Sequence, residues 1–550
     1  MKTQVKKCIA LLLALVLFGT SLAGCAFIAG EEYEESDDST GPVFVPEDET
    51  EDGIIRDGRL SISFVPEDAL NPYTSTSRDN LAVSGLIYEG LFALDEAFTA
   101  IPVLAENIST VDGSRFLIEI KSGVTFHNGA ALTAADVIYS MNRARRSALF
   151  SSRLEIITDY NRVQNAEGET SPYAFEILIN RVHGNLPVLL TFPIIQSGTG
   201  YNTVPPGTGP FFHPYDEGLP RLEAFSAHRY RENLPIDTIY LAEIGTVEQL
   251  TAHFNSGLLD IVALDPTTTG EPRIAGTREL RQVEASMIDF IGFNVNRPET
   301  GRLEVRQAIS RAIDRAYITE NIMRGNAVSS TLPIHPILPF YDEFLALQHE
   351  FDLEFAREML AGTHTIPREP EAEREEQDPE DGSAEGGEIE EAQAPRTRLT
   401  LLVASGNTMR LDVASFIATN ISALGYQVEI LDVPYTQFMD ALRGGNFDLF
   451  YGQVRLQPDF DLSPILHGEL AFGGIEGLVS PRVIDDFLAS MPSNRGEMAT
   501  AMGAAIFAEA PIATIGFRNL AVATQRGVVA GLSPTQDNVY HNVWDWLLDL

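Results

Sequence analysis

A loop late in the chain brings two carboxylates close together. It reads Gln453-Val-Arg-Leu-Gln-Pro-Asp459-Phe-Asp461-Leu-Ser-Pro464 and follows a segment with the composition of a strand. Carboxylates on a loop can accept hydrogen bonds from an ammonium group, and one such charge-assisted bond stabilises binding by about 1.5–3 kcal/mol. Asp459 and Asp461 are therefore candidate ligands for an amino group. The alternative is that one of them caps the helix expected to start near Leu462.

Five further side chains stand at positions where we expect the edges of a cleft. Each is a candidate contact for a small solute, and packing inside the protein is the alternative for all of them. The five are Tyr73, Tyr88, Asn294, Tyr451 and Arg455.

Two features that suggest chemistry are better explained by structure. His127 precedes an Asn128-Gly129 turn, and Thr133 is placed to cap the helix that follows. Gly207-Thr-Gly209 lacks the Lys-Ser/Thr of a phosphate-binding loop and the third glycine of a dinucleotide turn. We interpret both segments as turns.

Motifs of common envelope enzymes are missing from the sequence. It contains no H-E-x-x-H, no G-x-S-x-G and no cluster of histidine and cysteine after residue 25. We therefore expect no catalytic residue, no metal site and no cofactor. A lipid-anchored envelope hydrolase is kept as the rival class.

The N-terminus indicates export. Three lysines precede an apolar run from Ile9 to Phe18, which is shorter than the roughly 20 residues of a membrane span. The run ends at Leu22-Ala-Gly-Cys25, which resembles the bacterial lipobox, whose cysteine receives a diacylglycerol. We expect a signal peptide over 1–24, lipidation of Cys25 and an extracytoplasmic location on the cell membrane, facing the periplasm if the envelope has two membranes. Cys8 and Cys25 are the only cysteines, so no disulfide is expected.

The net charge of -40 excludes nucleic acid as a partner, because little here could neutralise phosphates. Two acidic segments rich in Pro, Gly, Ser and Glu carry much of this charge. We expect both to be disordered, because they cannot bury enough apolar surface to fold. The first, 25–57, reads as a tether, and the second, 366–395, as an insertion in a surface loop.

The remaining sequence predicts an α/β fold. Alternating apolar residues from Leu60 predict a strand, and a helix follows after a turn-rich loop. Later, strands near 399–403, 428–433 and 447–453 alternate with helices, and this βαβαβ order implies parallel strands. Ligands of open α/β sheets bind beyond the carboxyl ends of the strands. The loops at Ser405, at Pro434 and over 455–463 are the expected ligand-facing edge.

Two extended segments bracket the βαβ region. Ile288 to Val295 and Ile512 to Phe517 are both apolar enough for buried strands. Together they predict a two-strand hinge that joins the βαβ lobe to the rest of the chain.

Several collinear motifs resemble the extracellular solute-binding proteins of family 5, the oligopeptide, dipeptide and nickel receptors of ABC importers. The strongest is KSGVTFHNGAALTAADVIYSMNR over 121–143, which is similar to the family's R-x-G-V-x-F-H-D-G-x-P-L-T-A-x-D-V pattern. Further matches are YEGL from Tyr88, GTGPF from Gly207 and VRQAI from Val305. Asn128 and Phe211 depart mildly from the family's Asp and Tyr. More important, the family's ligand loop often reads W-x-G-D-x-x-D-P with an Asp that binds a peptide's ammonium group, and the loop after Gln453 has no Trp.

The resemblance implies a two-lobe, type II periplasmic-binding-protein-like fold with a two-strand hinge and an additional subdomain in the first lobe. We expect lobe 1 over 58–290 with the subdomain at about 89–200, lobe 2 over 291–510, and a return to lobe 1 over 511–550. The implied function is capture of a peptide for a permease and ATPase pair by a monomeric receptor. Receptors for a nickel or haem chelate or an oligosaccharide are the alternatives within this fold.

Overall fold

The computed structural model describes residues 58–164, 168–214, 216, 218–275, 278–361 and 397–550. The expected signal peptide, Cys25, the acidic tether (25–57) and the acidic insertion (366–395) lie outside these residues. In the part of the chain that is described, no helix is both long enough and apolar enough to cross a bilayer.

The first strand and helix form the unit predicted from the sequence. β1 (Leu60–Phe64) is followed by α2 (Arg78–Ile87), and the side chain of Ser77 caps this helix by accepting a hydrogen bond from the Asn80 N–H. β1 lies parallel between β10 (Thr238–Glu243) and β11 (Ile261–Leu264). These elements belong to lobe 1, defined here as the described residues of 58–283 and 519–550 outside 89–200. Its other elements are β8 (Phe211–Phe212), β9 (Arg221–Ala224), η3 (Arg231–Asn233), α4 (Val247–Asn255), β18 (Val529–Ala530), η5 (Val543–Asp545) and β19 (Leu547–Leu548).

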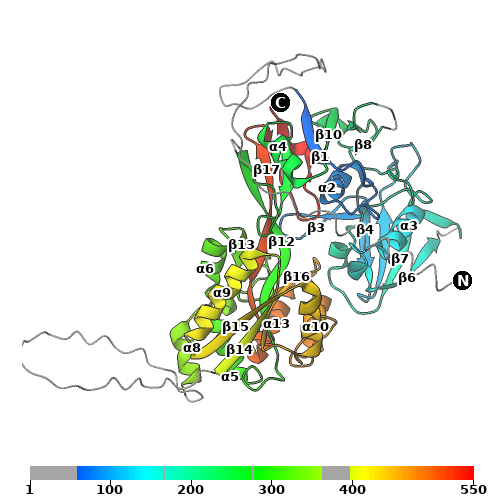
Figure 1. Cartoon of the computed structure of the whole chain (residues 1–550). Coiled ribbons are helices and arrows are strands. Elements are labelled where there is room, and N and C mark those ends of the chain that lie inside the picture. The colour runs from blue at the N-terminus through cyan, green and yellow to red at the C-terminus, as the bar shows by residue number, and fades with distance from the viewer. Residues whose placement is uncertain (1–57, 165–167, 215, 217, 276–277, 362–396) are drawn as a thin grey trace, which may run out of the picture. The chain divides into compact units, whose positions relative to one another are not determined.

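Two long strands join the lobes, which confirms the predicted hinge. β12 (Arg278–Phe293) and β17 (Ile512–Gln525) pair antiparallel along most of their length (Figure 1). Over 521–524, β17 also pairs with β11 of lobe 1, whereas over 287–293 β12 pairs with β16 of lobe 2. The ladder between the two long strands is interrupted between Val283 and Met287, where a bulge separates the two halves. One sheet therefore continues through both lobes, in the order β15-β14-β16-β12-β17-β11-β1-β10-β9-β8.

Lobe 2, defined here as the described residues of 287–518, contains the predicted βαβαβ unit. Its strands β14 (Thr397–Ala404), β15 (Tyr426–Val433) and β16 (Leu449–Arg455) are parallel, and α9 (Thr408–Ser422) and α10 (Tyr435–Gly444) connect them. Gly425 and Gly445 take positive φ at the ends of these helices, as their positions predict. The other elements of the lobe are α5 (Leu303–Arg311), α6 (Arg315–Tyr317), η4 (Ile318–Ile322), β13 (Ala327–Ser329), α7 (Glu343–Leu347), α8 (Leu353–Leu360), α11 (Ser463–Leu466), α12 (Pro481–Ala489) and α13 (Arg495–Glu509).

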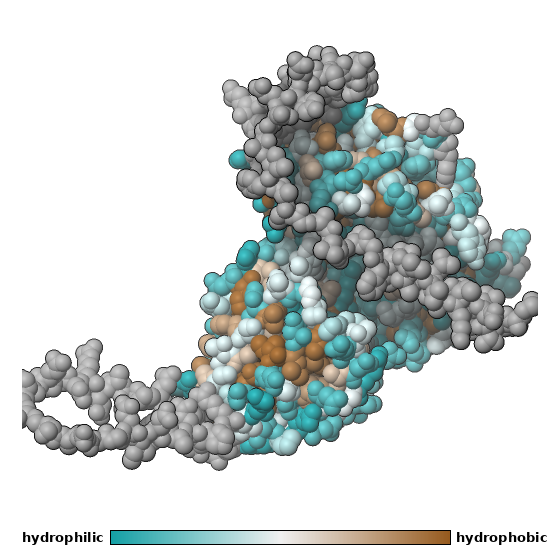
Figure 2. All heavy atoms as spheres, viewed as in Figure 1, coloured by the Kyte–Doolittle hydropathy of each residue, from teal (hydrophilic) through white to brown (hydrophobic). Residues whose placement is uncertain are grey.

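Apolar clusters cover both faces of the sheet in lobe 2. One contains Leu401, Ile417 and Tyr451, and the other contains Phe290, Phe450 and Phe517. Two cross-strand pairs on the second face place a phenylalanine ring over a glycine, Phe290 over Gly452 and Phe450 over Gly292. Figure 2 shows apolar residues on the surface of lobe 2 in this view, amid a surface that is otherwise largely hydrophilic.

The subdomain, residues 89–200, is built around a four-stranded antiparallel sheet in the order β4-β5-β7-β6. A separate apolar cluster that includes Phe116, Val137 and Phe175 forms its core. Thr133 precedes α3 (Ala134–Ala144), and both its N–H and its hydroxyl donate to Asp136, which confirms its predicted place at the N-cap. The other elements are β2 (Phe92–Leu94), β3 (Ala100–Pro102), β4 (Ala105–Thr110), β5 (Arg115–Ile120), η1 (Ser152–Leu154), β6 (Ile157–Gln164), β7 (Thr170–Ile179) and η2 (Leu186–Leu189).

His127 holds the Gly207–Gly209 turn, which confirms the structural interpretation of both segments. Its Nδ1 accepts a hydrogen bond from the Gly207 N–H at 3.3 Å, and its Nε2 lies 3.1 Å from the Gly209 carbonyl oxygen. Because Nδ1 accepts, Nε2 carries the proton and the ring is neutral. A β-carbon on either glycine would collide with the backbone of Ile87, so the turn requires glycine at both positions.

Burial of His127 makes stability depend on pH. Burial lowers the pKa of this imidazole to about 4, although the Gly209 carbonyl and the Glu89 carboxylate favour its protonated form. The unfolded chain takes up a proton near pH 6.5, whereas the folded protein does so only near pH 4. As the pH is lowered from about 6.5 to about 4, we therefore expect the free energy of unfolding to fall by about 3 kcal/mol, at about 1.4 kcal/mol per pH unit.

Denaturation by urea at several pH values between 4 and 7 measures this effect. A His127→Gln variant, which can still hydrogen-bond but does not titrate, will show a flatter dependence than the natural chain. Equal slopes for the two proteins would contradict the assignment to His127.

Candidate functional site

The loop that follows β16 (456–462) is buried and is shaped by its own carboxylates. Phe460 has a φ of +59° and turns the loop toward α11. One oxygen of Asp461 accepts a hydrogen bond from the Ser463 N–H at 2.8 Å, at the start of that helix. One oxygen of Asp459 accepts from the Asp461 N–H at 3.1 Å. The N-cap of α11 is Leu462, so Asp461 accepts this hydrogen bond from the position before the N-cap and neither carboxylate is the cap residue itself.

The second oxygen of each carboxylate accepts a hydrogen bond from a side chain of the subdomain. Arg181 Nη2 donates to Asp461 Oδ2 at 2.5 Å, and His183 Nε2 donates to Asp459 Oδ2 at 3.2 Å. The latter pair is almost inaccessible, with side-chain exposures of 0% for His183 and 3% for Asp459. Burial raises the pKa of Asp459, but the hydrogen bonds from His183 and from the Asp461 backbone outweigh it, so its pKa lies below the ordinary value. The carboxylate is therefore ionised at neutral pH.

All four oxygens of the two carboxylates have partners within the chain. Their role in binding a ligand's ammonium group stays a prediction. To reach them, such a group would have to displace Arg181 from Asp461 or His183 from Asp459. The first exchange is the easier of the two, because Arg181 and Asp461 keep 31% and 12% of their side-chain surface.

A second polar cluster joins three separate parts of the chain at Asp537. Arg153 of the subdomain donates to Asp537 Oδ2 at 3.1 Å, and Arg455 at the end of β16 donates to Oδ1 at 2.9 Å. Burial alone would raise the pKa of Asp537, but the two arginines lower it by a larger amount, so the pKa lies below its ordinary value. Gln457 adds a link to the subdomain through the Ser152 hydroxyl at 2.9 Å. Arg455 is thus placed at the boundary between the lobes, as the sequence predicts.

An aromatic contact crosses the same boundary. Phe98 lies at the tip of the β2–β3 hairpin with a φ of +58° and is only 4% exposed. Its ring meets that of Phe460 edge to face at 5.4 Å between centroids, and His335 lies 5.5 Å away. A left-handed conformation strains a bulky residue and persists only where the surrounding structure holds it. Here two such residues, one from the subdomain and one from lobe 2, hold each other. We call this region the junction. It consists of the loop 456–462 together with Phe98, Arg153, Arg181, His183, Arg455 and Asp537.

Tyr451 lies on β16 away from the junction loop and near the hinge. Its hydroxyl donates to Asp289 Oδ2 at 2.7 Å, and Gln453 donates to the other oxygen of Asp289 at 2.9 Å. The loop after β14 borders a cavity of about 180 Å³ beside this network. Asn407 in that loop donates to the Thr267 carbonyl of lobe 1 at 2.9 Å, so this loop too meets the other lobe.

The other three predicted contacts lie elsewhere. Asn294 donates to the carbonyls of Gly445 and Phe447, at the beginning of β16 rather than at its end. It does not share the junction, because β12 runs antiparallel to β16 and its carboxyl end is at the opposite edge of lobe 2. The hydroxyls of Tyr73 and Tyr88 donate to the carbonyls of Pro193 and Pro205.

Most partners at the junction could not be predicted from the sequence. Arg153, Arg181 and His183 belong to a subdomain whose contacts with lobe 2 are set by tertiary structure. Asp537 lies in a C-terminal segment that showed no strand or helix pattern. Phe98 occupies a hairpin turn, where the sequence offers no reason to expect a buried aromatic residue.

Comparison with known proteins identifies relatives of the whole architecture. The family model for the Middle region of the bacterial extracellular solute-binding proteins, family 5, matches residues 99–468. The oligopeptide-binding protein AppA of Bacillus subtilis is 23% identical over 412 residues, which cover 71% of this chain and 72% of the relative. Protein XP55 of Streptomyces lividans is 25% identical over 431 residues, covering 75% and 73%.

A solved structure of a peptide binding protein, AppA of Clostridium difficile, shares the fold. It superposes with a TM-score of 0.67 at 16% identity and covers 89% of this chain and 100% of its own. The likeness confirms the two-lobe periplasmic-binding fold expected from the sequence.

Proposed function

The chain belongs to the bacterial extracellular solute-binding proteins of family 5, and from this we propose that it captures peptides between its lobes and delivers them to an ABC permease. The family consists of solute-binding proteins of ABC importers rather than enzymes. The oligopeptide-binding relative supports peptides as the class of solute.

The junction is the observation that supports this proposal most strongly. Polar groups from lobe 2, the subdomain and the C-terminal segment meet where β16 ends, which is the expected place for a ligand in an α/β sheet. Among the described strands, only β12 and β17 form a ladder that runs through both lobes, so the lobes can move about these two strands while each keeps its own core.

Binding follows from this arrangement. Peptide enters when the junction is open, contacts both sides, and stabilises the closed form by its higher affinity for it. Hydrogen bonds to the peptide main chain supply affinity with little dependence on side chains, as in strand addition. Closure then brings Arg181 to Asp461 and His183 to Asp459, and the permease recognises the closed form.

The place of the protein in the envelope is part of the proposal. Cys25 receives the lipid, the segment 25–57 spans the distance to the membrane, and the body acts as a monomer. A Cys25→Ala variant will be released from membranes into the soluble fraction, whereas the natural chain will stay with them. Retention of the variant would remove Cys25 as the anchor.

A ligand screen tests the choice of solute. The soluble body, residues 54–550, is heated with pools of short peptides, nickel chelates, haem or oligosaccharides. A ligand that binds only the folded state raises the melting temperature, by an amount equivalent to about 2.7 kcal/mol at one hundred times its Kd. We expect a shift with peptides. A shift with sugars or metal chelates and none with peptides would replace the proposed solute while leaving the receptor function in place.

A further inference from the structure

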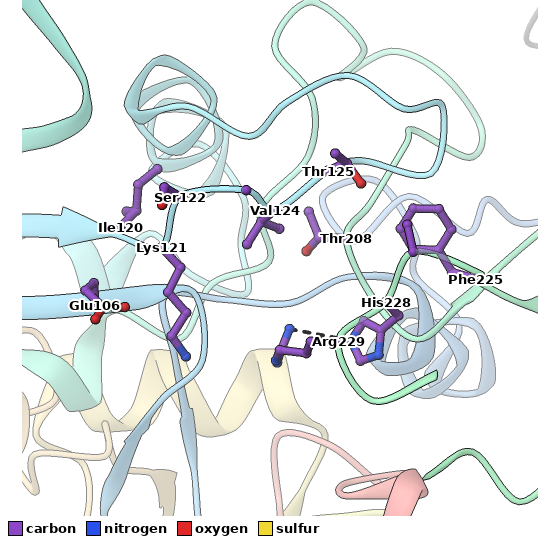
Figure 3. Close-up of a pocket in the computed structure, with 12 residues that line it drawn as sticks. Glu106, Ile120, Lys121, Ser122, Val124, Thr125, Thr208, Phe225, His228 and Arg229 are labelled. Atoms are coloured by element: carbon purple, nitrogen blue, oxygen red, sulfur yellow. Dashed lines mark hydrogen bonds between the residues drawn. The ribbon is translucent and has the colours of Figure 1, made fainter. Parts of the chain in front are cut away.

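Lobe 1 and the subdomain enclose a second cavity, which contains no residue of the junction. It has a volume of about 570 Å³, within the range of small-molecule sites. Four segments form its wall: Glu106 of β4, the end of β5 with the loop after it, the turn at Thr208, and residues 225–229 (Figure 3). Nothing from lobe 2 lines it, so movement of the lobes does not create or destroy this cavity.

The cavity contains an unusual cation. The chain has only four lysines, and Lys121 is the only one outside residues 1–7. Its Nζ donates to the Val103 carbonyl at 2.8 Å, and no carboxylate of the described residues lies within ion-pairing distance. An ammonium group has three donors, so Lys121 keeps hydrogen atoms for another acceptor. A cation without a carboxylate partner stands out in a chain with 78 acidic and 38 basic residues.

Arg229 lies on the same side of the cavity as Lys121 (Figure 3), and its guanidinium is bound by Glu89. Its Nη2 and Nη1 donate to the two oxygens of Glu89 at 2.6 and 3.1 Å. Burial alone would raise the pKa of Glu89, but His228 and Arg229 lower it by a larger amount. The pKa of Glu89 therefore lies below its ordinary value, and the carboxylate is ionised at neutral pH. Glu89 thereby fixes the guanidinium and balances its charge, which leaves the charge of Lys121 as the one to be neutralised.

The rest of the wall limits what the ligand can be. Ser122 and Thr125 add hydroxyls, and Ile120, Val124 and Phe225 add an apolar surface. Glu106 is exposed at the wall and repels a dianion about twice as strongly as a monoanion. The volume far exceeds that of a single carboxylate. We propose that this cavity binds a small organic monocarboxylate, with its carboxylate on Lys121 and its apolar part against Val124 and Phe225.

A single lysine in the body makes the test specific. Biosynthetic 15N labelling of lysine in the full chain leaves the three donors of each ammonium group in place, and a Lys121→Arg variant assigns the Lys121 signal. The probe is 3-phenylpropionate, with its primary amide and inorganic phosphate as matched comparisons. We expect 3-phenylpropionate to shift the Lys121 signal with saturation, while its primary amide leaves that signal in place.

Two variants are expected to change the affinity for 3-phenylpropionate in opposite directions. Lys121→Met will bind the probe about 10- to 100-fold more weakly, because it loses a charge-assisted hydrogen bond. Its melting temperature will change little, since among the described residues Lys121 donates one hydrogen bond, to the Val103 carbonyl. Glu106→Gln will bind more tightly, because it removes the repelling charge. The proposal would be overturned if the amide shifted the Lys121 signal as much as 3-phenylpropionate does, or if the shift did not saturate. It would also be overturned if phosphate bound more tightly than 3-phenylpropionate, or if Glu106→Gln bound 3-phenylpropionate more weakly than the natural chain. The test does not measure peptide binding, so the proposed carboxylate site and the proposed peptide-receptor function can each fail without the other.

Discussion

Gly184→Ala will separate the subdomain from lobe 2. A β-carbon at position 184 would lie 2.6 Å from the carbonyl carbon of Ser490 and closer still to its oxygen. The Gly184 N–H donates to the Leu488 carbonyl at 2.8 Å, so the two backbones are in direct contact and no flexible side chain can move aside. Overpacking at such a contact costs about 1–3 kcal/mol or more. We expect the junction to open and peptide affinity to fall at least about tenfold.

Hydrogen exchange measures this directly. The amides of segments 181–186 and 488–490 will lose protection in Gly184→Ala, while the strands in the core of each lobe keep theirs. Gly496→Ala is the matched control, because Gly496 lies in α13 with open space where the β-carbon would be placed. Alanine favours a helix over glycine by about 1 kcal/mol, so the control should be neutral or slightly stabilising. Unchanged protection around Gly184 would contradict the contact.

His183→Ala will destabilise the protein by about 1.5–3 kcal/mol, the strength of a hydrogen bond to a charged group. The Nδ1 of His183 accepts from the Asn185 N–H, so Nε2 carries the proton that Asp459 accepts, and the substitution leaves this buried carboxylate without its donor. Arg181→Ala removes the neighbouring pair, but that pair retains contact with water and should cost no more than about 1 kcal/mol. Denaturation by guanidinium will therefore rank the two variants far apart.

A double variant separates the pair from its surroundings. His183→Ala combined with Asp459→Ala removes the donor together with the carboxylate, so it should cost less than the sum of the single variants by more than about 1 kcal/mol. Additive costs would mean that the two side chains do not act as a pair. Equal costs for His183→Ala and Arg181→Ala would show that water reaches Asp459 as readily as Asp461.

Local patterns were enough to predict the main elements. The alternation around Leu401, the helical period through Ile417 and the glycine at 425 all act over a few residues, and the strand, helix and left-handed end of that helix follow from them. The hinge was recognised for the same reason, although its strands are longer than expected. β12 begins ten residues before Ile288, in a segment whose polar residues disguise the strand.

The junction depends on contacts between residues far apart in sequence. The sequence places Asp459 and Asp461 on a loop and offers either a ligand or a helix as their partner. Only the fold brings His183 to Asp459 across 276 positions and Arg181 to Asp461 across 280. The same holds for Phe98, whose strained backbone is explained by a ring 5.4 Å away in the other lobe.

The sequence by itself determined the family, the fold class, the order of the elements and the loop at which the lobes meet, because periodicity, turn residues and collinear motifs are properties of short segments. Tertiary structure decided which polar side chains pair, which aromatic residues cross the boundary, and that Lys121 faces a cavity with no carboxylate of the described residues within ion-pairing distance. Those features depend on burial and distance. A charged side chain affects the free energy of folding strongly only when folding removes it from water.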